Sequence, residues 1–125
     1  MSDEKFARTQ RWLALDNYRL RRLDAWCELQ RQLERQAGWV SLSDAARAEV
    51  EHTSGLADLD TTLRVIHRRL RRWLRALPTE PTGDIAVVAA SLQVAERLLP
   101  PEENRVVHRL IARSVRDLAR MQDPS

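Results

Sequence analysis

Residues 105–121 read RVVHRLIARSVRDLARM, a stretch that predicts an amphipathic α-helix with two unlike faces. Its five arginines are Arg105, Arg109, Arg113, Arg116 and Arg120. At about 100° per residue they fall within a wedge of roughly 80°. Large apolar residues cluster on the other side: Val107, Leu110, Ile111, Leu118 and Met121. Such a helix packs through its apolar face and presents its arginine face to water or to a polyanion.

The long helical segment before it repeats this arrangement. Its arginine-rich face contains Arg64, Arg68, Arg71, Arg72 and Arg75. The apolar side carries Leu59, Leu63, Ile66, Leu70, Leu74 and Leu77. No acidic residue occurs between Thr61 and Leu77, so salt bridges from other helices or phosphate groups must neutralise this charge.

The composition predicts an all-α fold. A chain of 125 residues is long enough for one domain with its own core. Three glycines and five prolines offer little of the turn chemistry that a β fold needs. Residues 85–95 are apolar almost throughout, which is typical of a helix buried on most sides. We therefore expect a single domain over residues 1–125, a five-helix bundle with a long N-terminal helix and a buried apolar fourth helix.

Capping and helix-breaking residues predict where these helices begin and end. The expected helices cover residues 3–36, 44–53, 58–77, 85–99 and 101–122. Gly38 ends the first helix, and Ser43 and Asp84 cap the second and the fourth. Asp58 or Asp60 opens the third helix, and Pro101 is the first residue of the last.

Two tryptophans of the first helix are candidate protein-interface residues. Trp12 and Trp26 lie two heptads apart and share a helix face. Large aromatic side chains in this position serve either in the core or at a subunit interface. Both roles are open at the level of the sequence.

No pattern of catalytic or metal-binding residues stands out. Glu49 and His52 form a single Glu-x-x-His, whereas di-iron bundles use two copies with two further glutamates. The chain has no His-Glu-x-x-His, no phosphate-binding glycine loop and no Gly-x-Ser-x-Gly elbow. Its one cysteine, Cys27, excludes an internal disulfide and a cysteine-rich metal site. We expect a non-enzymatic protein with no metal and no cofactor.

The N-terminal residues and the hydropathy predict a cytoplasmic protein. Met1 to Lys5 is charged, and no apolar stretch approaches the roughly 18 residues of a membrane span. We therefore expect neither a signal peptide nor a membrane partner.

The kind of basic residue favours nucleic acid as a partner. Lys5 is the only lysine among 21 basic residues, so the other 20 are arginines. Guanidinium binds phosphate in a planar, bidentate way, although a GC-rich genome would also supply arginine in place of lysine. Two arginine faces side by side would form a groove along a phosphate backbone, with contacts that do not depend on sequence. Trp73 is the one good candidate for stacking on a base, with a place in the core as the alternative.

The acidic residues of the chain point to an alternative to nucleic-acid binding. They are Asp16, Asp24, Glu28, Glu34, Glu49 and Glu51. Ion pairs within the bundle or between copies would use much of the positive face. The chain would then be a helical adaptor or assembly protein, of a phage or plasmid type, whose arginine faces form protein–protein ion pairs.

The two arginine stripes, Arg64 to Arg75 and Arg105 to Arg120, and the apolar helix Ile85 to Leu99 carry a resemblance. A small, all-helical, arginine-rich chain with these features resembles the small subunits of class 1 CRISPR effector complexes, which act in antiviral defence. The resemblance implies a ribonucleoprotein subunit that stacks in several copies along larger backbone subunits. It also implies that the arginines hold the backbone of a guide RNA or a target strand, RNA or DNA, and that Trp12, Trp26 or the long first helix contacts the next copy.

Overall fold

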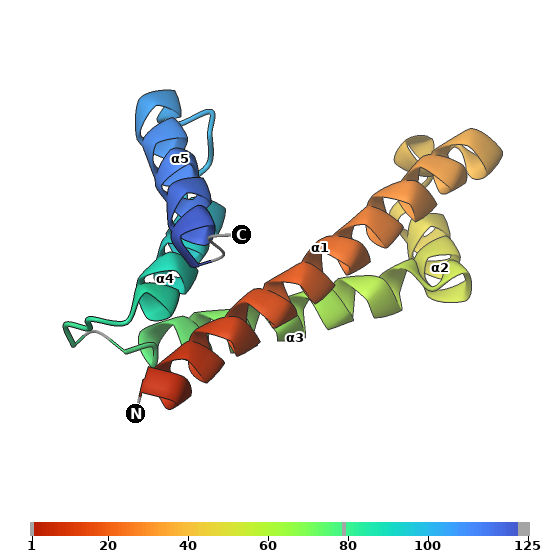
Figure 1. Ribbon diagram of the computed structural model, residues 1–125. Helices are drawn as coiled ribbons and strands as arrows, with labels where there is room; N and C mark the ends of the chain where they lie inside the picture. The colour runs from red at the N-terminus through yellow and green to blue at the C-terminus, as the bar shows by residue number, and fades with distance from the viewer. Residues whose placement is uncertain (1, 79, 123–125) are drawn as a thin grey trace. The chain divides into compact units, whose positions relative to one another are not determined.

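The computed structural model describes residues 2–78 and 80–122, and this part of the chain is helical with no β-strand (Figure 1). The helices are α1 (Ser2–Ala37), the 3-10 helix η1 (Trp39–Ser41), α2 (Asp44–Ser54), α3 (Leu56–Arg75), α4 (Ile85–Leu98) and α5 (Arg105–Gln122). The predicted all-α, five-helix fold is confirmed.

Contacts divide the chain into two compact units. Unit 1 combines Met1–Ala14 with Trp73–Ser125, and unit 2 is Leu15–Arg72. Helices α1 and α3 each begin in one unit and end in the other. The single domain expected over residues 1–125 remains a prediction.

Unit 1 is built around α4 and α5, which pack against each other (Figure 1). Its buried residues come from α1 and α4: Thr9, Trp12, Leu13, Val87, Ala89, Ala90 and Val94. The fourth helix is apolar, as predicted, but Ile85, Val88 and Leu98 are exposed. Four of its residues are buried and five more are half-buried, which agrees with the predicted buried fourth helix.

Unit 2 brings the second half of α1 together with α2 and most of α3. Its buried residues are Asp16, Leu33, Leu56, Ile66 and Leu70. Trp26 of α1, Glu51 of α2 and Leu56 of α3 line one hollow, so the three helices meet there. The buried Asp16 accepts a hydrogen bond from Nε of Arg19 at 2.8 Å, which compensates its desolvation in part.

Three predicted helix-terminal residues, Gly38, Ser43 and Asp84, have the expected roles, and Gly55 ends a helix as Gly38 does. Gly38 and Gly55 adopt left-handed conformations, with φ of 60° and 89°, and follow the ends of α1 and α2. Ser43 caps α2 by accepting from the N–H of Ala46, and Asp84 caps α4 in the same way. These local signals fix the ends of three helices.

The predicted starts of α3 and α5 are wrong. Helix α3 begins at Leu56, directly after Gly55, because the left-handed glycine reverses the chain without a linker. Helix α5 begins at Arg105 rather than at Pro101. The Asn104 side chain accepts from the N–H of Val107 at 3.1 Å and caps the helix at this later start.

Candidate nucleic-acid interface

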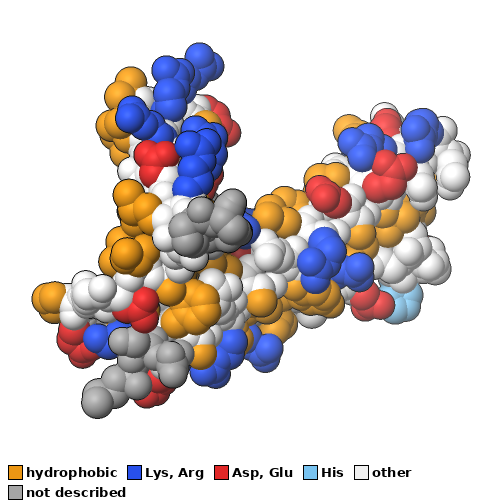
Figure 2. All heavy atoms as spheres, in the orientation of Figure 1, with side chains coloured by type: hydrophobic (Ala, Val, Ile, Leu, Met, Phe, Trp, Pro, Cys, Tyr) orange, Lys and Arg blue, Asp and Glu red, His pale blue; other side chains and the backbone are white. Residues whose placement is uncertain are grey.

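The arginines of α5 form a continuous exposed strip, the α5 arginine row. Its members are Arg105, Arg109, Arg113, Arg116 and Arg120, and all five are exposed. The helical rise spreads them over about 22 Å along one side of the helix. Figure 2 shows basic side chains gathered over α5, with hydrophobic side chains beside them. The row is therefore accessible to a ligand along its whole length.

The packing of α5 on α4 determines which side carries this row. Ile111, Val115 and Leu118 are half-buried and lie on the side of α5 away from the arginines. No described residue of α5 is fully buried. Val107, Leu110 and Met121, which the sequence assigns to the packing face, are exposed, because α4 covers only part of that face.

A second strip, the α3 arginine row, lies on α3. It comprises Arg64, Arg68, Arg71, Arg72 and Arg75, all exposed. At about 100° per residue these positions fall within roughly 100° of the helix circumference. The buried Ile66 and Leu70 lie on the opposite side and hold the helix to its unit. Three members of the row line one surface hollow together with Thr61 and His67.

The two rows belong to different parts of the chain. The α5 arginine row lies in unit 1, and the α3 arginine row lies in unit 2 except for Arg75. Each row is therefore a candidate surface in its own right. A joint groove formed by both rows remains a prediction.

Most of these arginines have no acidic partner. Arg64 pairs with Asp60 at 2.6 Å, and Arg113 pairs with Asp117 at 3.8 Å. Both arginine side chains remain more than 70% exposed. For the other eight, no carboxylate among residues 2–78 and 80–122 lies within ion-pair distance. The positive charge of both rows is thus largely uncompensated within the described chain.

Three acidic residues of α1 bind arginines of their own helix. Glu4 pairs with Arg8 at 2.6 Å, and Asp16 pairs with Arg19. Glu28 pairs with its neighbours Arg31 and Arg35 at 2.8 and 3.8 Å. The hydrogen bond from Arg31 lowers the pKa of Glu28. Of the carboxylates that the sequence offered as partners of the arginine rows, Asp16 and Glu28 therefore pair with arginines of α1 instead.

The two candidate interface tryptophans have different environments. Trp12 is 2% exposed and belongs to the core of unit 1. This burial favours the core role over the interface role, and the assignment of Trp12 to an interface stays a prediction. Trp26 is half-buried beside Trp39 and Leu56 and retains a surface that a partner can reach.

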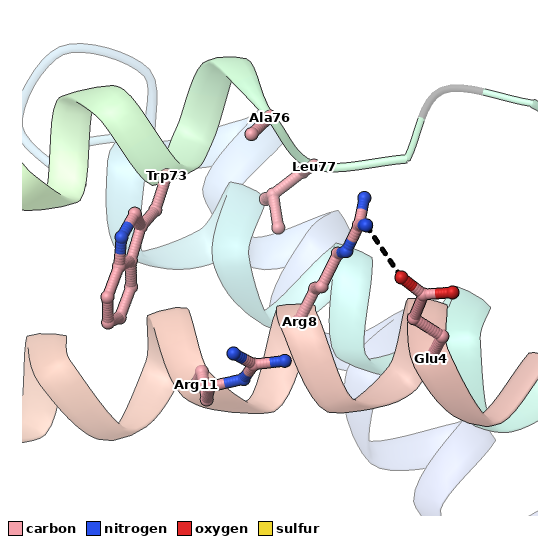
Figure 3. A pocket seen from close by; sticks show the side chains of 6 residues that line it. All are labelled: Glu4, Arg8, Arg11, Trp73, Ala76 and Leu77. Atoms are coloured by element: carbon pink, nitrogen blue, oxygen red, sulfur yellow. Dashed lines mark hydrogen bonds and ion pairs between the residues drawn. The ribbon is translucent and has the colours of Figure 1, made fainter.

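Trp73 lies in a site that the sequence did not reveal. It is half-buried and lines a hollow of about 280 Å³ in unit 1, together with Arg8 and Arg11 of α1 (Figure 3). The contact joins residues more than 60 positions apart, so helical periodicity alone gives no signal for it. The only trace in the sequence is that Arg8 and Arg11 share a face of their helix.

The described residues contain no metal-ligand cluster and no helix that could span a membrane. Glu49 and His52 are exposed, and no three histidine, cysteine or acidic side chains in the described chain group as metal ligands. None of the helices within residues 2–78 and 80–122 combines the length and apolar character needed to cross a bilayer.

Comparisons with known proteins identify no relative of this chain. No protein-family model, curated protein or solved structure matches it.

Proposed function

We propose that this protein is a non-enzymatic subunit that binds the backbone of nucleic acid without reading its sequence. The observation that carries the proposal is the pair of exposed arginine rows, in which eight of ten guanidinium groups have no carboxylate partner in the described chain. Arginine-rich surfaces of this kind suit phosphate, because guanidinium forms bidentate hydrogen bonds with phosphate oxygens.

The geometry of the α5 arginine row suits a phosphate backbone. A strand with about 3.4 Å of rise per nucleotide presents about six phosphates over the 22 Å of the row. Binding would release condensed counterions, so the affinity would fall steeply with salt concentration. Contacts of this type position the strand but do not discriminate between bases.

We further propose that the subunit works in several copies within a ribonucleoprotein, as the resemblance to class 1 CRISPR small subunits implies. Support comes from apolar side chains that unit 1 leaves in water. Val106, Leu110 and Met121 on α5 are 68%, 56% and 66% exposed. They lie between the arginine row and the side that packs on α4, so a neighbouring copy could cover them without blocking the arginines.

Two substitutions test this self-association surface. In the double variant Leu110→Glu, Met121→Glu, we expect the native mass in solution to fall to the 14.5 kDa of one chain, because two charges would enter an apolar interface. Helicity should not change, since both side chains are exposed. Sedimentation velocity at several concentrations measures the mass.

The double variant Val40→Glu, Val65→Glu is the matched control, because it places the same charges on exposed apolar positions of unit 2. A wild-type chain that is monomeric at every concentration contradicts self-association.

Affinity purification from the native host tests the proposed function as a whole. The tagged protein is purified at moderate salt with and without nuclease, and proteins and nucleic acids are both identified. We expect RNA of uniform length together with a larger, repeated backbone protein. If a protein partner survives nuclease and no nucleic acid is recovered, the adaptor function replaces this proposal.

A further inference from the structure

The hollow beside Trp73 has a lining of three chemical kinds. Trp73 forms an aromatic wall, and Ala76 and Leu77 add apolar surface next to it. Arg8 and Arg11 reach in from α1 on the other side (Figure 3). All of these residues lie within unit 1. An aromatic and apolar wall facing guanidinium groups suits a ligand with one flat, weakly polar part and one anionic part.

The charge of the hollow is positive and concentrated on Arg11. Glu4 also lines the site, and its carboxylate binds Nη2 of Arg8 at 2.6 Å. Arg11 is exposed and has no carboxylate partner among the residues the structure describes. The lining of the hollow thus offers one uncompensated cation to an anionic group.

The size of the hollow limits the flat part of the ligand to one small group. Pockets for small molecules usually enclose about 300–1,000 Å³, so 280 Å³ lies at the lower limit. A base that is paired and stacked in a duplex is not available to such a site, whereas a base of a single strand is.

We propose that this hollow holds one unstacked base of a single-stranded nucleic acid. Trp73 stacks on the base, and Arg11 binds the adjoining phosphate. The inference rests on the proposed function and adds to it the class of ligand. The arginine rows accept the backbone of any strand, and the Trp73 hollow makes the protein prefer a single strand to a duplex. Stacking tolerates all four bases, so the preference does not depend on sequence.

The test compares three fluorescent probes of equal length by anisotropy: a mixed-sequence single-stranded DNA, its duplex, and a single strand of abasic nucleotides. Wild-type protein should bind the normal single strand most tightly. The substitution Trp73→Ala should weaken that binding about 5- to 150-fold and should leave the duplex and abasic probes unchanged. Trp73→Phe, which keeps an aromatic face, should stay close to wild type.

Several results would overturn the inference. Equal wild-type affinity for the normal and abasic strands excludes a base in the hollow, and this comparison needs no variant. The inference also fails if a folded Trp73→Ala variant, checked by circular dichroism, binds the single strand as wild type does. If wild-type protein binds strand and duplex equally, the inference is wrong while the proposed function stands. If it binds none of the probes, both are wrong.

Discussion

Replacing Trp12 with alanine should lower the free energy of unfolding by about 3–5 kcal/mol, the usual cost of removing a buried tryptophan ring. Trp12 is 2% exposed, and the adjacent buried residues Thr9 and Leu13 belong to the same core. A loss of this size is a large fraction of the roughly 5–15 kcal/mol that stabilises an ordinary domain. Denaturant unfolding followed by circular dichroism measures the change.

Trp26→Ala is the matched control for this prediction. It makes the same substitution on the same helix, but the Trp26 side chain is only half-buried, so we expect a smaller loss of stability. If Trp12→Ala leaves the unfolding free energy unchanged and instead reduces the mass of an assembly, Trp12 is an interface residue and the described core is incorrect.

The triple substitution Arg109→Gln, Arg113→Gln, Arg116→Gln should weaken binding to single-stranded nucleic acid about 100-fold at 0.1 M salt. Each lost phosphate contact reduces the slope of log K against log[salt] by about 0.7 for a single strand, so three contacts reduce it by about 2. The three side chains are exposed, and their removal leaves the contact between α5 and α4 in place. Fluorescence anisotropy over a salt series measures both quantities.

A second triple variant with the same net charge distinguishes an effect of the position of the arginines from an effect of the overall charge. Arg21→Gln, Arg31→Gln, Arg35→Gln also reduces the formal charge from +3 to 0. These arginines are exposed on α1, where Arg31 and Arg35 bind Glu28 and Arg21 lies over the Tyr18 ring. We expect at most a small loss of affinity. Equal losses in both triple variants would mean that net charge, rather than the α5 arginine row, drives binding.

Local sequence signals predicted much of the fold because helix ends depend on a few adjacent residues. Ser43 and Asp84 cap helices as expected, and Gly38 takes the left-handed conformation. The predicted starts of α3 and α5 were wrong because, at each of these places, two neighbouring residues can both mark the start of a helix. Gly55 ends α2 and directly precedes the first residue of α3. In α5 the cap is Asn104, although Pro101 would also be acceptable as a first helical residue.

The arginine rows followed from periodicity, since a helix that packs by one side exposes the other. Burial of individual apolar residues did not follow. Trp12 and Trp26 have the same spacing pattern, yet only Trp12 is enclosed. Leu110 belongs to the apolar side of α5 but is exposed, because its burial depends on how far α4 extends over that side. Sites formed by segments distant in sequence, such as the hollow lined by Arg11 and Trp73, can be recognised only in the folded structure.

The salt dependence of binding by the wild-type protein tests the central claim most directly. A mixed-sequence single strand is titrated from 50 to 300 mM salt, in roughly the range where counterion release is usually measured. Contacts from one arginine row predict a slope of log K against log[salt] of about −3.5, and contacts from both rows about −7. Strands of different sequence should give the same slope. No binding at the lowest salt, or an affinity that salt does not change, would contradict the account.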